Sequence, residues 1–191
     1  MSDLHAALLA ERRSAYARLR GGFPIPLAGT TYWALLAVIG YVLPAETWYW
    51  AALFGSGLIF PLALMYAALF KNPFMKDRTA VTGVLVPAFI SMLLFWPMAI
   101  AALWTAEHLF PLILAIGMSL HWPVIGWSYA RLPVFAGHAI IRAVIVFAIW
   151  HLGSPLDQIT ILPAAVAAIY LLTVIVVFID SGRVKARLSQ D

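Results

Sequence analysis

Six long apolar runs dominate the sequence and limit the folds that are open to it. Each run is close to the roughly twenty residues that an α-helix needs to cross about 30 Å of hydrocarbon. They cover residues 24–43, 47–70, 79–104, 110–130, 133–152 and 159–179. Hydrophobic residues make up 64% of the chain and charged residues only 10%, whereas soluble domains carry about 25% charged residues. We therefore expect an all-α protein, a polytopic membrane bundle of six transmembrane helices.

The segments that flank these runs divide the chain into three parts. Residues 1–22 predict a cytoplasmic, interfacial amphipathic helix, and a solvated arm is the alternative. Its apolar face would carry Leu4, Leu8, Ala15 and Leu19. Residues 23–179 are expected to form the transmembrane domain, and residues 180–191 a basic cytoplasmic tail. No small-residue cleavage site follows the first run, so we expect that run to remain as a span.

Lysine and arginine fall almost entirely on one side of the predicted membrane. The loops at residues 44–46, 105–109 and 153–158 contain neither residue, whereas the other loops and both terminal segments are basic. Cytoplasmic loops carry an excess of these residues, so both termini are expected in the cytoplasm. The net charge of +4 then reflects membrane topology, and we expect no nucleic-acid partner.

Polar side chains enter the hydrocarbon in the fourth and fifth runs. A turn of about two residues at Arg131 joins these runs, so they should be antiparallel neighbours. Counting from the turn places His121 level with Arg142, about 13 Å inside the membrane. His138 lies one helical turn from Arg142, on the same face. We expect His121, Trp122, His138 and Arg142 to form one polar cluster near the membrane centre.

Arg142 is the costly member of this cluster. An arginine at the centre of a membrane helix costs about 2.5–3.5 kcal/mol, and no predicted span contains Asp or Glu in its interior. The remaining partners are backbone carbonyls near prolines, water, a lipid phosphate, an anionic ligand, or the hydroxyls of Ser91, Ser119 and Thr173. The cluster is therefore either a ligand-binding site or a structural polar network between helices.

Several kinds of chemistry find no support in the sequence. The absence of cysteine excludes thiolate metal sites and iron–sulfur clusters. His121 and His138 are expected at different depths, which disfavours a bis-histidine haem, and no carboxylate accompanies them for a metal. We expect no cofactor. Motifs of the G-x-S-x-G, P-loop or H-E-x-x-H type are absent, so an enzyme is the less favoured interpretation.

Four short stretches carry a resemblance to a known family. They are residues 55–62 (GSGLIFPL), 96–97 (WP), 117–127 (GMSLHWPVIGW) and 138–142 (HAIIR). In these stretches the chain resembles a family of small bacterial multi-pass membrane proteins of unknown function. The resemblance implies a bacterial inner-membrane location and marks His121, His138 and Arg142 for study. It implies no particular activity.

The leading hypothesis is a protein that binds or passes a small anionic or amphipathic molecule at a mid-membrane pocket. Membrane lipid is an expected partner. Six short spans enclose little volume, so a transport path would need a homo-oligomer. One alternative is a membrane-embedded enzyme acting on lipid, with a histidine as general base and Arg142 holding a phosphate. The other is a structural or accessory subunit in which the cluster only fixes helix packing.

The charge asymmetry predicts the orientation of the chain. Single cysteines at Glu46, Glu107 and Asp157 should react with an impermeant thiol reagent added to intact cells. Cysteines at Asn72 and Ser189 should not react in intact cells. Labelling at Asn72 but not at Glu107 would overturn the orientation.

Overall fold

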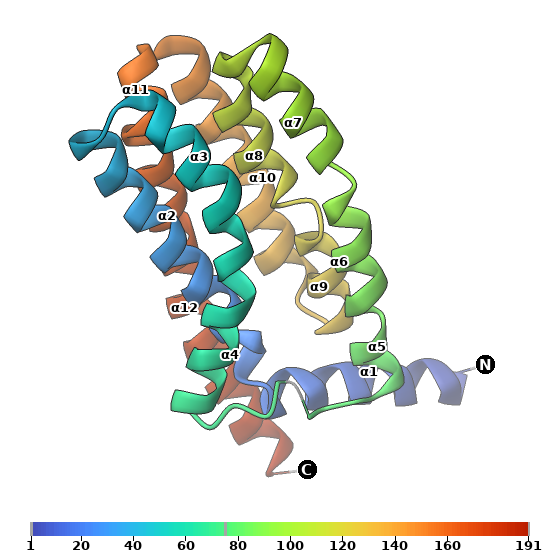
Figure 1. Ribbon diagram of the computed structural model, residues 1–191. Coiled ribbons are helices and arrows are strands. Elements are labelled where there is room, and N and C mark those ends of the chain that lie inside the picture. Colours follow the sequence, from blue (N-terminus) through green and yellow to red (C-terminus); the bar gives the residue numbers. More distant parts are fainter. Residues whose placement is uncertain (1, 75, 191) are drawn as a thin grey trace.

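The structure, a computed structural model, describes residues 2–74 and 76–190, and these residues form helices and no strands (Figure 1). The N-terminal segment and the first three predicted runs contain α1 Ser2–Arg18, η1 Arg20–Gly22, α2 Pro24–Val42, α3 Ala45–Gly55, η2 Ser56–Leu58, α4 Ile59–Leu69, α5 Ala80–Gly83, α6 Leu85–Leu93 and α7 Trp96–Thr105. The remaining helices are η3 Glu107–Leu109, α8 Phe110–Gly117, α9 Trp122–Ser128, α10 Leu132–Leu152, α11 Pro155–Ile159 and α12 Ile161–Leu188.

Six helical stretches are long and apolar enough to cross a membrane, which confirms the predicted fold class. They are Arg20–Val42, Ala45–Leu69, Val81–Thr105, Glu107–Ser128, Leu132–Leu152 and Pro155–Leu188. The last helix differs from the prediction at its end. It continues without a break through residue 180 as far as Leu188, so most of the predicted basic tail is helical.

Prolines stand at breaks that divide the third and fourth spans into shorter helices. Pro87 and Pro97 lie in the first turns of α6 and α7, and the regular α-helix is interrupted by turn residues just before each helix. Kinks are expected where prolines lie inside a span, and the third span is broken at both. The fourth span, expected to be continuous, is also broken, because residues 118–121 form a turn before α9 and its Pro123. Proline has no N–H to donate and fits only the first turn of a helix, so each one marks a restart.

The last span is the centre of the bundle. Helix α12 packs against α2, α10 and α1, and α2 in turn packs against α4. Helix α2 approaches α12 closely at Gly29 and α11 closely at Gly40. A Cβ atom on Gly29 would lie 2.6 Å from the Tyr170 ring, and one on Gly40 would lie 2.0 Å from the Ile159 carbonyl oxygen.

The fourth and fifth spans form the predicted hairpin. Helix α10 packs against both α8 and α9, and the turn between them has Ala130 at φ 53°. Counting from the turn predicts that Gly126 lies opposite Gly137, but the register differs. A Cβ on Gly126 would instead meet Phe135, whereas Gly137 faces open space.

Both termini lie at one end of the bundle, together with the basic loops (Figure 1); we name this the basic end. Helix α1 lies across it, and the first half of α1 projects beyond the bundle (Figure 1). Of the predicted apolar face, Ala15 and Leu19 are buried, whereas Leu4 is 77% exposed. The Arg12 Nε donates to the Trp127 carbonyl over 2.6 Å, and Arg131 pairs with Asp180 over 2.6 Å. These bonds fix the ends of α9, α10 and α12 relative to one another.

The close approach of α2 to the end of α11 predicts that one added methyl group at Gly40 destabilises the protein. Gly40→Ala should lower the free energy of unfolding by about 1–3 kcal/mol, because the new Cβ meets rigid backbone. Gly137→Ala is the matched control. Its Cβ meets nothing within 4 Å, so it should change stability by less than about 1 kcal/mol, through helix propensity alone. Thermal unfolding of the purified protein in detergent compares the two, and equal melting temperatures would contradict the packing.

Candidate functional site

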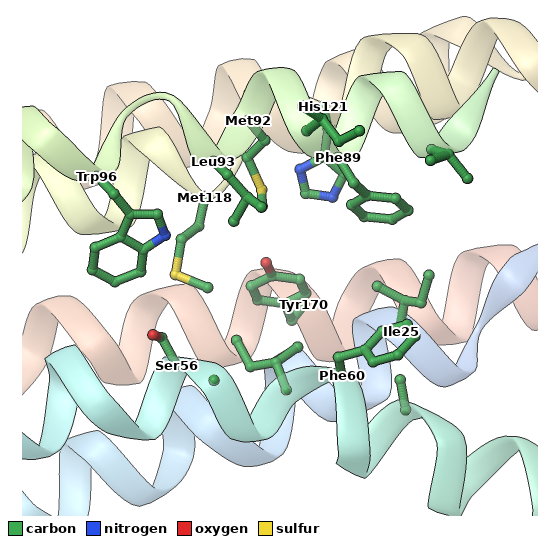
Figure 2. Close-up of a pocket in the computed structure, with 15 residues that line it drawn as sticks. Ile25, Ser56, Phe60, Phe89, Met92, Leu93, Trp96, Met118, His121 and Tyr170 are labelled. Carbon is green, nitrogen blue, oxygen red and sulfur yellow. The ribbon is translucent and has the colours of Figure 1, made fainter.

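A lateral slot of about 420 Å³ lies between the second and third spans (Figure 2). Helix α4 and the turn before it form one wall, and α6 forms the other. These two helices pack chiefly on different partners, α4 on α2 and α6 on α9. The floor contains Ile25, Met118, His121 and Tyr170. The volume lies in the range of about 300–1,000 Å³ that is typical of small-molecule sites.

The slot opens at the outer surface of the bundle, where lipid would surround the protein. Phe60, Val86 and Ile90, on its rim, are each more than half exposed, whereas Tyr170 and His121, on its floor, are 4% and 5% exposed. Along the third span the lining runs from Val86 to Trp96, which is about 15 Å at 1.5 Å per residue. The slot is therefore long, apolar and parallel to the helices.

His121 is a polar side chain on this apolar floor. The turn at residues 118–121, set by Pro123, removes it from a regular helix and directs it into the slot (Figure 2). Its ring packs 4.9 Å from the Phe89 ring and 5.1 Å from the Trp122 ring. Both ring nitrogens are buried and have no hydrogen-bond partner among the described residues. A neutral imidazole has one donor and one acceptor, and the described residues use neither of those of His121.

A second cavity, of about 460 Å³, lies on the other side of α6 and shares His121 with the slot. Its lining also includes Met92, which belongs to the slot as well, and residues of α9 and of the preceding turn. His121 is thus the polar contact common to both cavities.

Tyr170 connects the slot to the polar cluster behind it. Gly29 leaves room for its ring, and Figure 2 shows the ring lying between the walls, with Trp96 toward one end and His121 toward the other. The Tyr170 hydroxyl accepts a hydrogen bond of 2.8 Å from the Arg142 Nη1. Because the oxygen serves as the acceptor in this bond, the hydroxyl hydrogen remains available to a molecule in the slot.

Arg142 is fully buried behind Tyr170. Its guanidinium lies 5.3 Å from the centre of the Trp33 ring and 4.9 Å from that of Tyr170, which are cation–π distances. Its Nε and Nη2 have no hydrogen-bond partner among the described residues. The described ion pairs join Arg18 and Arg131 to acids and do not include Arg142. The hydrogen bond and the cation–π contacts of this cation are therefore made with neutral aromatic side chains.

His138 occupies the same buried layer. Its Nδ1 lies 2.7 Å from the Thr173 hydroxyl, and that hydroxyl donates to the Ile169 carbonyl over 2.9 Å. A hydroxyl has one hydrogen, so the Thr173 oxygen accepts the bond from the Nδ1–H of His138. This assignment leaves the Nε2 of the neutral ring as an acceptor, and Nε2 has no partner among the described residues. The Trp122 ring covers His138 at 4.6 Å.

The four predicted site residues lie in one group of neighbouring side chains, but only one of them lines the slot. His121 lines the slot, whereas Trp122, His138 and Arg142 lie behind Tyr170, in contact with its ring or hydroxyl. No hydrogen bond joins His121 to Arg142 among the described residues. The sequence reasoning missed Tyr170 and Trp33. A usable signal existed for Tyr170, because a tyrosine in the middle of an apolar run is unusual when tyrosines gather at membrane interfaces.

Unpaired polar atoms concentrate in this one region. Among the described residues, the buried side-chain nitrogens that lack a hydrogen-bond partner belong to Trp33, His121, Trp122, His138 and Arg142. Contacts through Tyr170 and Trp122 connect these side chains into a single group. Native structures pair most of their buried polar groups, so such a concentration calls for a specific explanation.

The hydrogen bond to Thr173 yields a test of the buried layer. Thr173→Val should destabilise the protein by about 1–3 kcal/mol, because it leaves a buried histidine N–H without an acceptor. Thr30→Val is the matched control, since the Thr30 hydroxyl donates only to the Pro26 carbonyl of its own helix. We expect it to cost less than about 1 kcal/mol. Equal melting temperatures for the two variants would contradict the assigned bond.

Comparison with known proteins places the chain in a family without assigning an activity. The model of a family of unknown function, DUF7010, matches residues 8–180, a range that includes every residue of the site. No curated protein and no solved structure matches the chain. The resemblance seen in the sequence is thereby confirmed in its coarser part, a family of unknown function. The chain belongs to the family of unknown function DUF7010.

Proposed function

We propose that this membrane protein binds an amphipathic molecule in the slot between α4 and α6, with the polar group of that molecule at Tyr170 and His121. The observation that carries the proposal is the position of the unpaired buried nitrogens. They gather beside an apolar slot that opens laterally. An apolar pocket with a few convergent polar groups is the usual form of a binding site for small molecules.

The energetics favour a ligand over a purely structural role. A buried donor or acceptor without a partner costs about 1–3 kcal/mol, whereas a helix contact made of apolar side chains avoids that cost. His121 makes no hydrogen bond within the described chain, so it contributes none to holding the helices together. A bound molecule that hydrogen-bonds to His121 and Tyr170 would remove part of the cost.

The surroundings of the site support a membrane location for this function. The slot opens among exposed apolar side chains, so a molecule dissolved in the hydrocarbon would reach it without crossing water. The basic end carries the lysines and arginines other than Arg142, which supports an inner membrane with cytoplasmic termini. A homo-oligomer would serve a path across the membrane.

A single substitution separates the binding role of His121 from a packing role. His121→Leu should raise the melting temperature of ligand-free protein, because two buried nitrogens without partners are removed. The same change should reduce the amount of amphipathic molecule that co-purifies, as measured by native mass spectrometry from mild detergent. Stability and binding thus move in opposite directions.

His108→Leu is the matched control, because His108 is exposed and lies outside the slot. It should retain the bound molecule of the wild type. If His121→Leu lowers the melting temperature and leaves the bound molecules unchanged, His121 is a packing residue and the proposed function is wrong.

A further inference from the structure

We infer that the molecule bound in the slot is a single-chain carboxylate of the fatty-acid class. Its carboxylate would lie at Tyr170 and His121, and its chain would follow α6. This inference rests on the proposed function and adds three properties of the ligand: the charge of its head, the size of its head and the number of its chains.

The charge of the head follows from Arg142. Its guanidinium is fully buried, has two nitrogens without partners and belongs to none of the described ion pairs. An acceptor that takes the free hydroxyl hydrogen of Tyr170 would be two hydrogen bonds from Arg142, within about 6 Å. An opposite charge at about 4–6 Å favours the ionised form of a carboxyl group. Because one cation lacks a counter-ion, the site favours a ligand whose head carries a single negative charge.

The size of the head follows from the donors that face the slot. At the proposed position of the head, Tyr170 and His121 each offer one hydrogen, whereas the indole N–H of Trp96 lies toward the other end of the slot (Figure 2). The described lining contains no lysine or arginine. The two donors at the head position match the two oxygens of a carboxylate. A phosphate monoester carries more charge and more acceptor oxygens, and phosphate sites usually supply arginine or lysine directly. The slot therefore fits a carboxylate better than a phosphate.

The number of chains follows from the shape of the cavities. The slot is apolar, runs parallel to the helices and extends about 15 Å along the third span, so it has the form of one extended acyl chain. The second cavity shares only His121 and Met92 with the described lining of the slot, and α6 stands between the two. Two chains joined at one glycerol could not occupy both cavities while the head stays at Tyr170.

Photolabelling of the full-length protein tests each property. The protein is placed in nanodiscs of phosphatidylcholine, and the probe is a fatty acid with a diazirine in the middle of its chain. We expect labelled peptides from α4 and α6, near Phe60 and Met92. Oleate should displace the probe. Oleyl alcohol should need a concentration at least about tenfold higher for the same displacement, because hydrogen bonds to a charged group stabilise binding more than those to a neutral group, by about 1.4 kcal/mol. Dioleoyl phosphatidate should not displace it.

Two variants locate the preference for the carboxylate. Tyr170→Phe and Arg142→Gln should both bring oleate and oleyl alcohol to equal potency while the slot still labels. Tyr170→Phe keeps the ring and the packing, so it remains informative if Arg142→Gln fails to fold. Tyr66→Phe is the matched control, because it also removes a hydroxyl hydrogen bond, the one to Thr31, outside the slot. It should keep the full preference for oleate.

The outcomes distinguish this inference from the proposed function. Equal potency of oleate and oleyl alcohol on the wild type would overturn the carboxylate assignment and leave amphiphile binding intact. If phosphatidate displaces the probe as effectively as oleate does, the inference that the ligand has a single acyl chain is wrong. Labelling of the wild type only outside the slot would overturn both the inference and the proposed function.

Discussion

A positive charge held at the centre of an apolar bundle is the constraint on which the rest of the site depends. Arg142 is fully buried, with one hydrogen bond to Tyr170 and aromatic rings as its other neighbours. Burying a charge without a counter-ion is expensive in any protein and most expensive in hydrocarbon. The glycine at position 29 places Tyr170 against this cation. Tyr170 accepts a hydrogen bond from Arg142 and also lines the slot. In the proposed function, a negatively charged ligand that hydrogen-bonds to Tyr170 lies close enough to Arg142 to balance its charge.

Breaks in the helices lie along the slot. The second, third and fourth spans each consist of shorter helices that restart part-way across the bundle. The turn before Pro123 carries His121, which lies on the floor of the slot. Irregular backbone at membrane depth is tolerated where protein covers it or where it lines a cavity.

Much of the fold was predictable from the sequence, because span length and hydropathy are local properties. The six spans, the breaks at Pro87 and Pro97, and the hairpin at Arg131 all follow from residue counts and from proline chemistry. The site was predictable only in part. His138 and Arg142 share a face because they lie one turn apart. The depth of His121 was not obtainable by counting, since the fourth span is broken. Tyr170 and Trp33 come from spans distant in sequence, and only packing brings them to Arg142.

In the proposed function, a bound molecule rather than the protein balances the charge of Arg142. An experimental structure of the wild-type protein in lipid nanodiscs, at a resolution that shows ordered ligands, would reveal that molecule. We expect one elongated density between α4 and α6 that ends within hydrogen-bonding distance of the Tyr170 hydroxyl. A slot closed by contact between α4 and α6, with the Arg142 nitrogens satisfied by backbone carbonyls or buried water, would contradict it.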